Sequence, residues 1–429
     1  MNSFTGKINW KTTTYRGELG NTINGILTTN LRILCREILR SIPKTMSIYL
    51  TGSYSRGEGS VLVEEGKVKI LSDYDLLVIS DAQPYLLRLR SNKLNDALFS
   101  IGLYNREMML GHPVAESAVM NRKQIQRVNP TLFNYELRTA KLIYGFEILE
   151  SVPKINASDI PQVNGLRLLF DRMLGAIIPF SVDFLHENPA EMKSRHLMFE
   201  TAKLLTGCRD ALLILNKVYF PTEKQKQNHF EFNYLTYQSL IQETDFLELA
   251  KKAHRYRLTP SKELEKNAVD LSLKAFRTAS IVLKIYLEKL YGIEESEWST
   301  IIDNFENIQF LPPSHNLASI FLTYQKNKKL YNYPSRTPLN KILGVLTLLV
   351  LSVGENGLNE ETLEKAQGIM GGNVLRVKAP VNKRELWMLL KDYVRQSYAS
   401  PFPSPPTIQD YFQAIIATTI QISRGMLRI

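Results

Sequence analysis

The sequence predicts an α+β protein, in which a small mixed sheet is followed by a mostly α-helical region. Short apolar segments separated by glycine-containing turns fill roughly the first 150 residues, a pattern typical of strands interrupted by a few helices. From about Pro161 onward, apolar residues instead recur at the spacing of three and four that one helix face requires. With 44% hydrophobic and 22% charged residues, the chain of 429 residues has the composition of a globular protein with ample core.

The first part of the chain contains the predicted sheet. Apolar residues at helix spacing over residues 23–42, with arginines on the other face, predict an amphipathic helix that ends at Pro43. A second helix is predicted over residues 85–103. Strands are predicted at residues 47–50, 61–63, 67–70, 76–79, 114–120 and 141–144. The second and third of these strands form a hairpin, because Glu64, Glu65 and Gly66 are suited to a turn between them.

The rest of the chain is predicted to be helical. We expect three segments: residues 1–155 as the sheet-containing domain, 156–300 as a helical domain beside it, and 301–429 as a helical C-terminal region. The clearest helical patterns lie at residues 166–178, 196–217, 263–290, 339–353 and 408–422. The most apolar run, residues 342–353, falls short of the roughly 18 to 20 residues of a membrane span, so a buried core helix and no membrane span are expected.

Charge and cysteine content narrow the function classes. A formal net charge of +11 favours an anionic partner, whether a nucleotide, a nucleic acid or a phosphorylated substrate. Two basic stretches, residues 251–262 and 324–336, could hold nucleic acid or be solvated faces, and the second interleaves its cations with tyrosines. Cys35 and Cys208 are too few for a disulfide framework. The N-terminus lacks the order of a secretory signal, so a cytoplasmic location is expected.

Two aspartates separated by one residue suggest a metal site. Asp73 and Asp75 lie in an extended segment, so both side chains project to the same face of the strand, about 7 Å apart at the backbone. Two such carboxylates repel unless a cation lies between them. Hard oxygen ligands suit Mg²⁺, with Mn²⁺ as an alternative, and Mg²⁺ is commonly bound by one or two carboxylates together with substrate phosphates.

The turn upstream of the aspartates has the features of a phosphate site. Gly52 allows the backbone to approach a ligand closely, and exposed N–H groups in such a turn can hold an anion. The hydroxyl of Ser53 adds a donor, and Arg56 can neutralise a phosphate through two hydrogen bonds. Together with the aspartates, this turn predicts a site for a nucleoside triphosphate and its metal.

These residues resemble the DNA polymerase beta-like nucleotidyltransferases. That pattern is an apolar strand, Gly-Ser or Gly-Gly, a short basic turn, and then Asp-x-Asp on the next strand. Here LTGSYSRGEGS is followed by SDYDLLVIS, and the resemblance covers about residues 20 to 150. It implies phosphate binding at Gly52, Ser53 and Arg56 and metal binding at Asp73 and Asp75.

The resemblance also implies two further residues. Members usually have a third carboxylate on a later strand, for which Glu116 is the candidate, because an acidic residue in an apolar strand needs a partner or a metal. An edge strand with Glu116 in water is the alternative, and Glu107 is the fallback. Related enzymes often place a lysine from a helical domain on the phosphates. Lys203 could be this lysine or a solvated one, and Tyr219 could stack on a base or belong to the core.

The function expected from these features is metal-dependent nucleotidyl transfer. A nucleoside monophosphate would move from ATP or another NTP to an acceptor, with release of pyrophosphate. Asp73, Asp75 and Glu116 would be the catalytic and metal-binding residues, and Gly52, Ser53, Arg56 and Lys203 would bind the nucleotide. The acceptor, whether a small molecule, a protein or an RNA, is left open. The alternative is a regulatory or interaction protein on the same fold that binds nucleotide without turnover.

Overall fold

The computed structural model describes residues 14–99, 101–104, 115–126, 130–241, 245–294, 297–305, 339–354, 357–370 and 382–397. These residues group into two compact units, each formed from two parts of the chain. The first unit takes the described residues of Met1–Gly165 and Ala190–Leu271, and the second those of Leu166–Pro189 and Ser272–Ile429. The three-segment division with boundaries at residues 155 and 300 stays a prediction.

A four-stranded mixed sheet lies in the first unit. Its strands are β1 (Thr45–Leu50), β4 (Tyr74–Ser80), β5 (Ala115–Asn121) and β6 (Lys141–Gly145), in the order β5-β4-β1-β6. Strand β1 is antiparallel to both β4 and β6, whereas β4 and β5 are parallel. The prediction of a small mixed sheet combined with many helices is thus confirmed.

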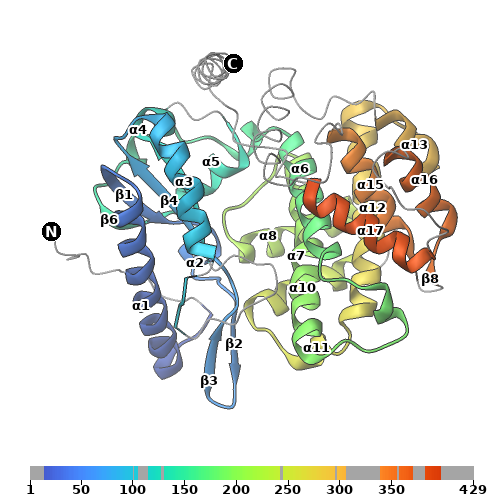
Figure 1. Ribbon diagram of the computed structural model, residues 1–429, viewed down its shortest axis with the longest axis horizontal. Coiled ribbons are helices and arrows are strands. Elements are labelled where there is room, and N and C mark those ends of the chain that lie inside the picture. Colours follow the sequence, from blue (N-terminus) through green and yellow to red (C-terminus); the bar gives the residue numbers. More distant parts are fainter. Residues whose placement is uncertain are drawn as a thin grey trace, which may run out of the picture. The chain divides into compact units, whose positions relative to one another are not determined.

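Helices cover both faces of this sheet. On one face, α1 (Gly17–Ser41) and α3 (Pro84–Phe99) contact each other, and their apolar residues share a core with alternate residues of β1 and β4 (Figure 1). The opposite face is covered through Ile125, Leu137 and Ile148. These residues belong to or adjoin α4 (Arg122–Gln126), η1 (Leu137–Thr139) and η2 (Leu149–Ser151), close to α5 (Leu132–Glu136). Successive side chains of β1 and β4 point to opposite faces of the sheet, and each face packs into its own apolar core.

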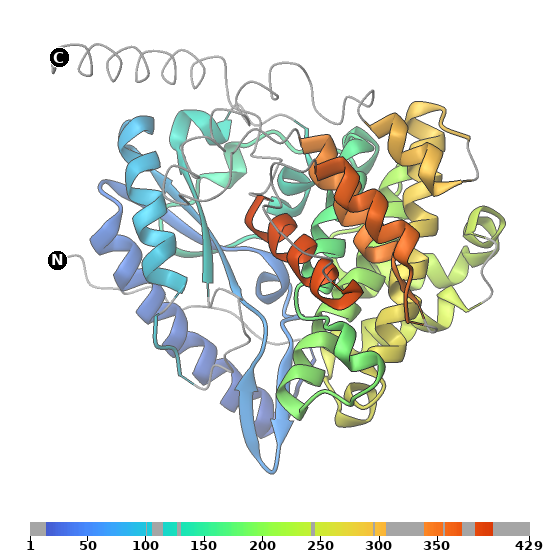
Figure 2. The same cartoon turned by 45° about the vertical axis from the view of Figure 1, so that its right-hand side comes forward.

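The predicted turn and hairpin connect β1 to β4. The turn contains a single helical turn, α2 (Gly52–Ser55), and the hairpin consists of β2 (Val61–Glu64) and β3 (Lys67–Ile70). Figure 2 shows the hairpin extending away from the four-stranded sheet. At its base, Tyr54 stacks on Tyr74 with ring centroids 4.9 Å apart, and the Tyr54 hydroxyl lies 3.3 Å from the carbonyl oxygen of Ser72. The turn is thereby held against the segment that leads into Asp73.

The first unit is completed by helices that follow later in the sequence. They are α7 (Glu191–Leu215), α8 (Glu223–Phe232), α9 (Tyr234–Ile241), α10 (Phe246–Leu258) and α11 (Lys262–Glu265), and η3 (Ala157–Asp159) precedes them. All residues of α7 from Ser194 onward are buried. The predicted helix at residues 196–217 is confirmed as α7, and its polar residues, including Lys203, Arg209 and Asp210, lie in the interior.

The described residues of the second unit are mostly helical. Most of α6 (Val163–Ile177) and α12 (Ala268–Tyr291) belongs to it, together with η4 (Val182–Leu185), α13 (Trp298–Asn304), α15 (Leu339–Leu351), α16 (Glu360–Met370) and α17 (Lys383–Ser397). A two-stranded ladder joins β7 (Val353–Gly354) to β8 (Gly357–Leu358). Helix α15 is the predicted buried apolar helix. Among the described helices, none is long and apolar enough to cross a membrane.

One helix prediction needs correction, and another lies outside the described residues. The pattern at residues 263–290 predicted one helix, but the chain forms α11 and α12 with a break between them. The break follows Glu265, whose carboxylate accepts hydrogen bonds from Arg195 and Tyr256. These tertiary contacts are invisible in a periodicity of apolar residues. The helix predicted at residues 408–422 lies outside the part of the chain that the structure describes.

Candidate metal and nucleotide site

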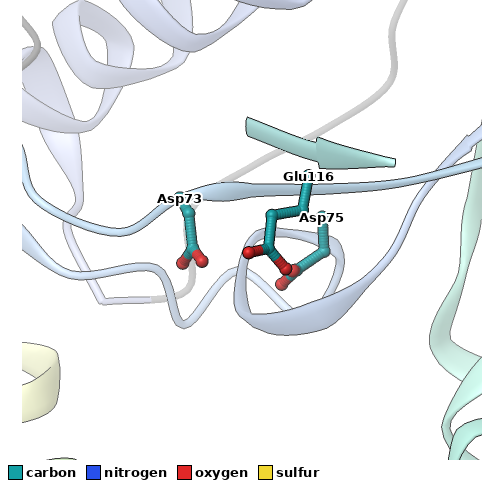
Figure 3. A group of neighbouring side chains, drawn as sticks. All are labelled: Asp73, Asp75 and Glu116. Carbon is teal, nitrogen blue, oxygen red and sulfur yellow. The ribbon is translucent and has the colours of Figure 1, made fainter. Parts of the chain in front are cut away.

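Three carboxylates meet at one end of the parallel strand pair. Asp75 lies on β4 directly opposite Glu116 on β5, and Asp73 lies just before β4, two residues from Asp75. Each residue offers an oxygen, and these three oxygens all lie within 4.8 Å of one another. Figure 3 shows the three side chains leaving their backbone segments on the same side. The pairing register of β4 and β5 thus brings together residues that are about 40 positions apart in sequence.

The three carboxylates lie close enough together for each to affect the charge of the others. Asp73 and Asp75 are partly buried and Glu116 is exposed. Burial, followed by the negative charges of Asp73 and Glu116, raises the pKa of Asp75 to about 8. Crowded carboxylates destabilise their own charged forms unless a cation compensates them. An all-oxygen set of three carboxylates fits a hard divalent ion such as Mg²⁺ or Mn²⁺, so the residues present suit the predicted metal.

Glu116 combines features of both sequence-based interpretations. Strand β5 is at the edge of the sheet, and the Glu116 side chain is exposed, as the alternative expected. The same side chain nevertheless lies beside Asp73 and Asp75, as the metal-site interpretation expected. Because its side chain is exposed, the Glu116 carboxylate is accessible to incoming molecules. Glu107, the fallback for the third carboxylate, lies outside the described residues.

The glycine of the turn is in close contact with this group. Gly52 has a φ of +63°, and a Cβ built on it would lie 1.9 Å from Asp75 Oδ2. The neighbouring Thr51 donates its backbone N–H to the Asp75 carbonyl oxygen at 2.8 Å. Ser53 follows Gly52 in α2 and is 9% exposed. The structure therefore places the predicted phosphate turn next to the predicted metal ligands.

Arg56 lies close to the same group but is largely buried. Its side chain is 6% exposed, and its Nε donates a hydrogen bond to Glu58 Oε2 at 3.0 Å. Burial lowers the pKa of Arg56, but the carboxylates of Glu136, Glu223 and Glu58 outweigh burial and hold this pKa above its ordinary value. The Arg56 charge in turn lowers the pKa of Asp75. Arg56 is thus a permanent cation near the carboxylates.

Lys203 is the second cation near the carboxylates. Its side chain is 10% exposed, which does not match the solvated-lysine alternative. The ammonium lies 3.2 Å from Glu200 Oε1 and 4.6 Å from the centroid of the Phe199 ring. Its positive charge lowers the pKa of Asp75 more than Arg56 does. Helix α7 therefore supplies a positive charge to the site from a distant part of the sequence.

A buried network of charges lies beside Arg56, and sequence reasoning missed it. Arg209 is fully buried and pairs with Asp210 and Glu223 at 2.6 and 2.7 Å. Lys226 pairs with the same two carboxylates at 2.6 and 2.8 Å. The signal in the sequence was a pair of opposite charges inside the otherwise apolar run of α7. Buried charges of this kind are tolerated only when each is paired.

Tyr219 belongs to this network. It is 3% exposed, its hydroxyl donates to Glu136 Oε1 at 2.9 Å, and Lys226 Nζ donates to that hydroxyl at 3.1 Å. These contacts correspond to the core alternative for Tyr219 rather than to a surface that stacks on a base. Burial and the nearby carboxylates raise the pKa of Tyr219 well above its usual value, so the hydroxyl keeps its proton.

The basic stretch at residues 251–262 is divided between interior and surface. Lys252 and Arg255 are exposed, whereas Tyr256 is buried and donates to Glu265 Oε1. Arg257 turns toward Glu223, with 3.4 Å between Arg257 Nη1 and Glu223 Oε1. Only part of this stretch is therefore available to an external anion. The second basic stretch, residues 324–336, lies outside the described residues.

Comparison with known proteins does not identify a family. Neither a scan against models of protein families nor a search of curated proteins finds a match to this chain. The resemblance to polymerase beta-like nucleotidyltransferases therefore stays a prediction, and the arguments below rest on the geometry of the site.

Proposed function

We propose that this protein transfers a nucleoside monophosphate from an NTP to an acceptor and releases pyrophosphate. The observation that carries the proposal is the cluster of Asp73, Asp75 and Glu116, whose oxygens lie within 4.8 Å of one another beside the Gly52 turn. Such a cluster concentrates negative charge, which a divalent cation would neutralise. When bound, the metal would polarise the α-phosphate and stabilise charge on the attacking and leaving oxygens.

The chain's own residues have separate tasks in this proposal. Asp73 and Asp75 would hold the cation. Because Gly52 has no side chain, the Asp75 carboxylate can lie against the turn, so a cation held by Asp75 would be next to phosphates bound at this turn. Arg56 and Lys203, whose charges already act on Asp75, attract the phosphates. Glu116 is the exposed member of the three carboxylates, so it is placed to accept a proton from the acceptor hydroxyl.

The reaction that these residues would support is an in-line displacement. The acceptor oxygen forms a bond to the α-phosphorus of the NTP, and its proton moves to Glu116. The bond between the α-phosphorus and the bridging oxygen to the β-phosphate breaks, and pyrophosphate leaves. Three intact carboxylates favour turnover over nucleotide binding alone, because binding alone would not need a concentration of negative charge that repels phosphates.

The test is an assay for transfer of labelled nucleotide in which the acceptor does not have to be known beforehand. The protein would be incubated with each α-labelled NTP and Mg²⁺ or Mn²⁺, alone and with cellular RNA, protein or metabolite extracts. The proposal expects label in one acceptor fraction together with pyrophosphate. Stabilisation of the fold by a metal–NTP complex without transfer to any fraction would instead support the binding-protein alternative. Absence of both transfer and stabilisation would reject the site.

A further inference from the structure

One buried donor of Arg56 has no acceptor among the residues that the structure describes. Its Nε is bonded to Glu58, but its Nη1 is buried and has no hydrogen-bond partner among the described residues. A buried guanidinium donor without an acceptor is costly, and such exceptions in a folded protein call for a reason. The Arg56 charge acts on Asp75, so the unsatisfied donor belongs to the neighbourhood of the candidate metal ligands. An oxygen of a bound anion could satisfy it.

Glu58 determines how this guanidinium is presented. Its carboxylate is 8% exposed and accepts the Glu223 backbone N–H at 3.0 Å on Oε1 and 3.1 Å on Oε2. Glu223 is the first residue of α8. The backbone N–H of Glu58 donates to the Ser53 carbonyl oxygen at 2.9 Å. Glu58 is thereby fixed both to the phosphate turn and to α8, and it occupies the Nε edge of Arg56.

We propose that Glu58 is a positioning residue that orients Arg56, leaving Nη1 for an anionic oxygen of the β- or γ-phosphate. This inference rests on the proposed function, because it assigns a phosphate donor within the same site. In this proposal, a triphosphate would extend to this donor, whereas a monophosphate bound at the metal would end before it. Glu58 itself touches no phosphate and acts through Arg56.

A purely structural role for the pair makes a different prediction. Arg56 also interacts electrostatically with Glu136 and Glu223. Its only role could therefore be to neutralise these carboxylates within the fold. In that case, changes at Glu58 would alter the stability of the fold and would affect the binding of triphosphates and monophosphates alike. The ratio of the two affinities therefore separates the two roles.

The experiment measures this ratio in variants of the full chain with Mg²⁺. The variants are Glu58→Gln, Arg56→Lys and the double variant. Glu64→Gln is the matched control, because Glu64 also pairs with a buried arginine, Arg195, at 2.9 Å. The probes are the four NTPs with their monophosphates, and inorganic tripolyphosphate with inorganic phosphate as a pair independent of the base. If Glu58→Gln fails to fold, Glu58→Asp retains the charge but moves the carboxylate.

We expect Arg56→Lys and Glu58→Gln each to weaken triphosphate binding about tenfold and monophosphate binding much less, as loss of one charged hydrogen bond requires. The double variant should bind no more weakly than Arg56→Lys, because both changes remove one interaction. Equal losses for both probes, additive losses, or an unchanged triphosphate affinity in Arg56→Lys would overturn the inference while leaving the proposed function standing. Failure of the unaltered protein to bind any triphosphate would reject both.

Discussion

Gly52 and Asp75 lie so close together that a Cβ on Gly52 would be 1.9 Å from Asp75 Oδ2. The two residues are on different segments, one after β1 and the other within β4, and the Thr51–Asp75 backbone hydrogen bond joins them. No side chain at position 52 can coexist with the present orientation of the Asp75 carboxylate. The turn thus limits the orientations open to the Asp75 carboxylate, a candidate metal ligand.

Replacing Gly52 by alanine should separate metal binding from folding. The added methyl group displaces the Asp75 carboxylate, and a φ of +63° adds a strain of roughly 1 to 2 kcal/mol for any L side chain. Gly66→Ala is the matched control, because Gly66 has a φ of +75° but open space around its Cβ position. We expect similar losses of stability, with stabilisation by Mg²⁺ and NTP lost only in Gly52→Ala. A normal response to Mg²⁺ and NTP in Gly52→Ala would contradict the proximity argument.

The metal-free protein should show a pH dependence that originates at Asp75. Burial and the charges of Asp73 and Glu116 raise its pKa from 3.8 to about 8 in the folded state, so the unfolded chain releases this proton at lower pH. Stability from this group is present below pH 3.8 and is lost as the pH rises toward 8. In the presence of a chelator, Asp75→Asn should therefore be more stable than the unaltered protein, and this difference in stability should grow between pH 5 and pH 9. Thermal unfolding measures it, and a constant difference would refute the crowding of charges.

A buried arginine is one of the links between the hairpin and the helices. Arg195 on α7 is 4% exposed and pairs with Glu64 of β2, with Glu265 and with Glu191. Removing Arg195 would leave the buried carboxylate of Glu265 without its cation, and breaking a buried ion pair in this way costs about 3 to 5 kcal/mol. Arg195→Met should show this loss in denaturant unfolding.

Arg384 provides the comparison for Arg195. It pairs with Asp183 at 2.5 Å, but its side chain is 60% exposed. Arg384→Ala should therefore leave the stability of the fold nearly unchanged, because solvent screens exposed pairs. Equal losses for Arg195→Met and Arg384→Ala would mean that the hairpin is not anchored by its buried ion pairs.

Local patterns predicted most of the fold because they reflect short-range physics. Apolar spacing in residues 23–42 matches α1, and the turn at Glu65 and Gly66 matches the hairpin, since each depends on neighbouring residues alone. The same spacing missed the interruption between α11 and α12, where Glu265 turns inward to Arg195. That contact joins residues 70 positions apart, which periodicity does not encode.

The candidate site was predictable to the extent that its parts are close in sequence. Gly52, Asp73 and Asp75 form a recognisable pattern, but the position of Glu116 depends on the register between β4 and β5. Glu58 lies only two residues from Arg56, but the sequence pattern does not single it out. Its carboxylate is held by the backbone N–H of Glu223, 165 positions later. Arg209 and Lys226 were missed for the same reason: their partners are assigned by packing of α7 against α8.

The measurement that tests the central claim most directly is nucleotidyl transfer by Asp73→Asn, Asp75→Asn and the double variant. Each substitution preserves size and removes the charge that a hard cation requires, so transfer with Mg²⁺ should fall by at least about 100-fold while the fold is retained. Asp81→Asn is the control, since Asp81 is an exposed carboxylate immediately after β4 and should leave transfer unchanged. Transfer near the unaltered level in a folded double variant would show that these aspartates are not the metal-binding centre.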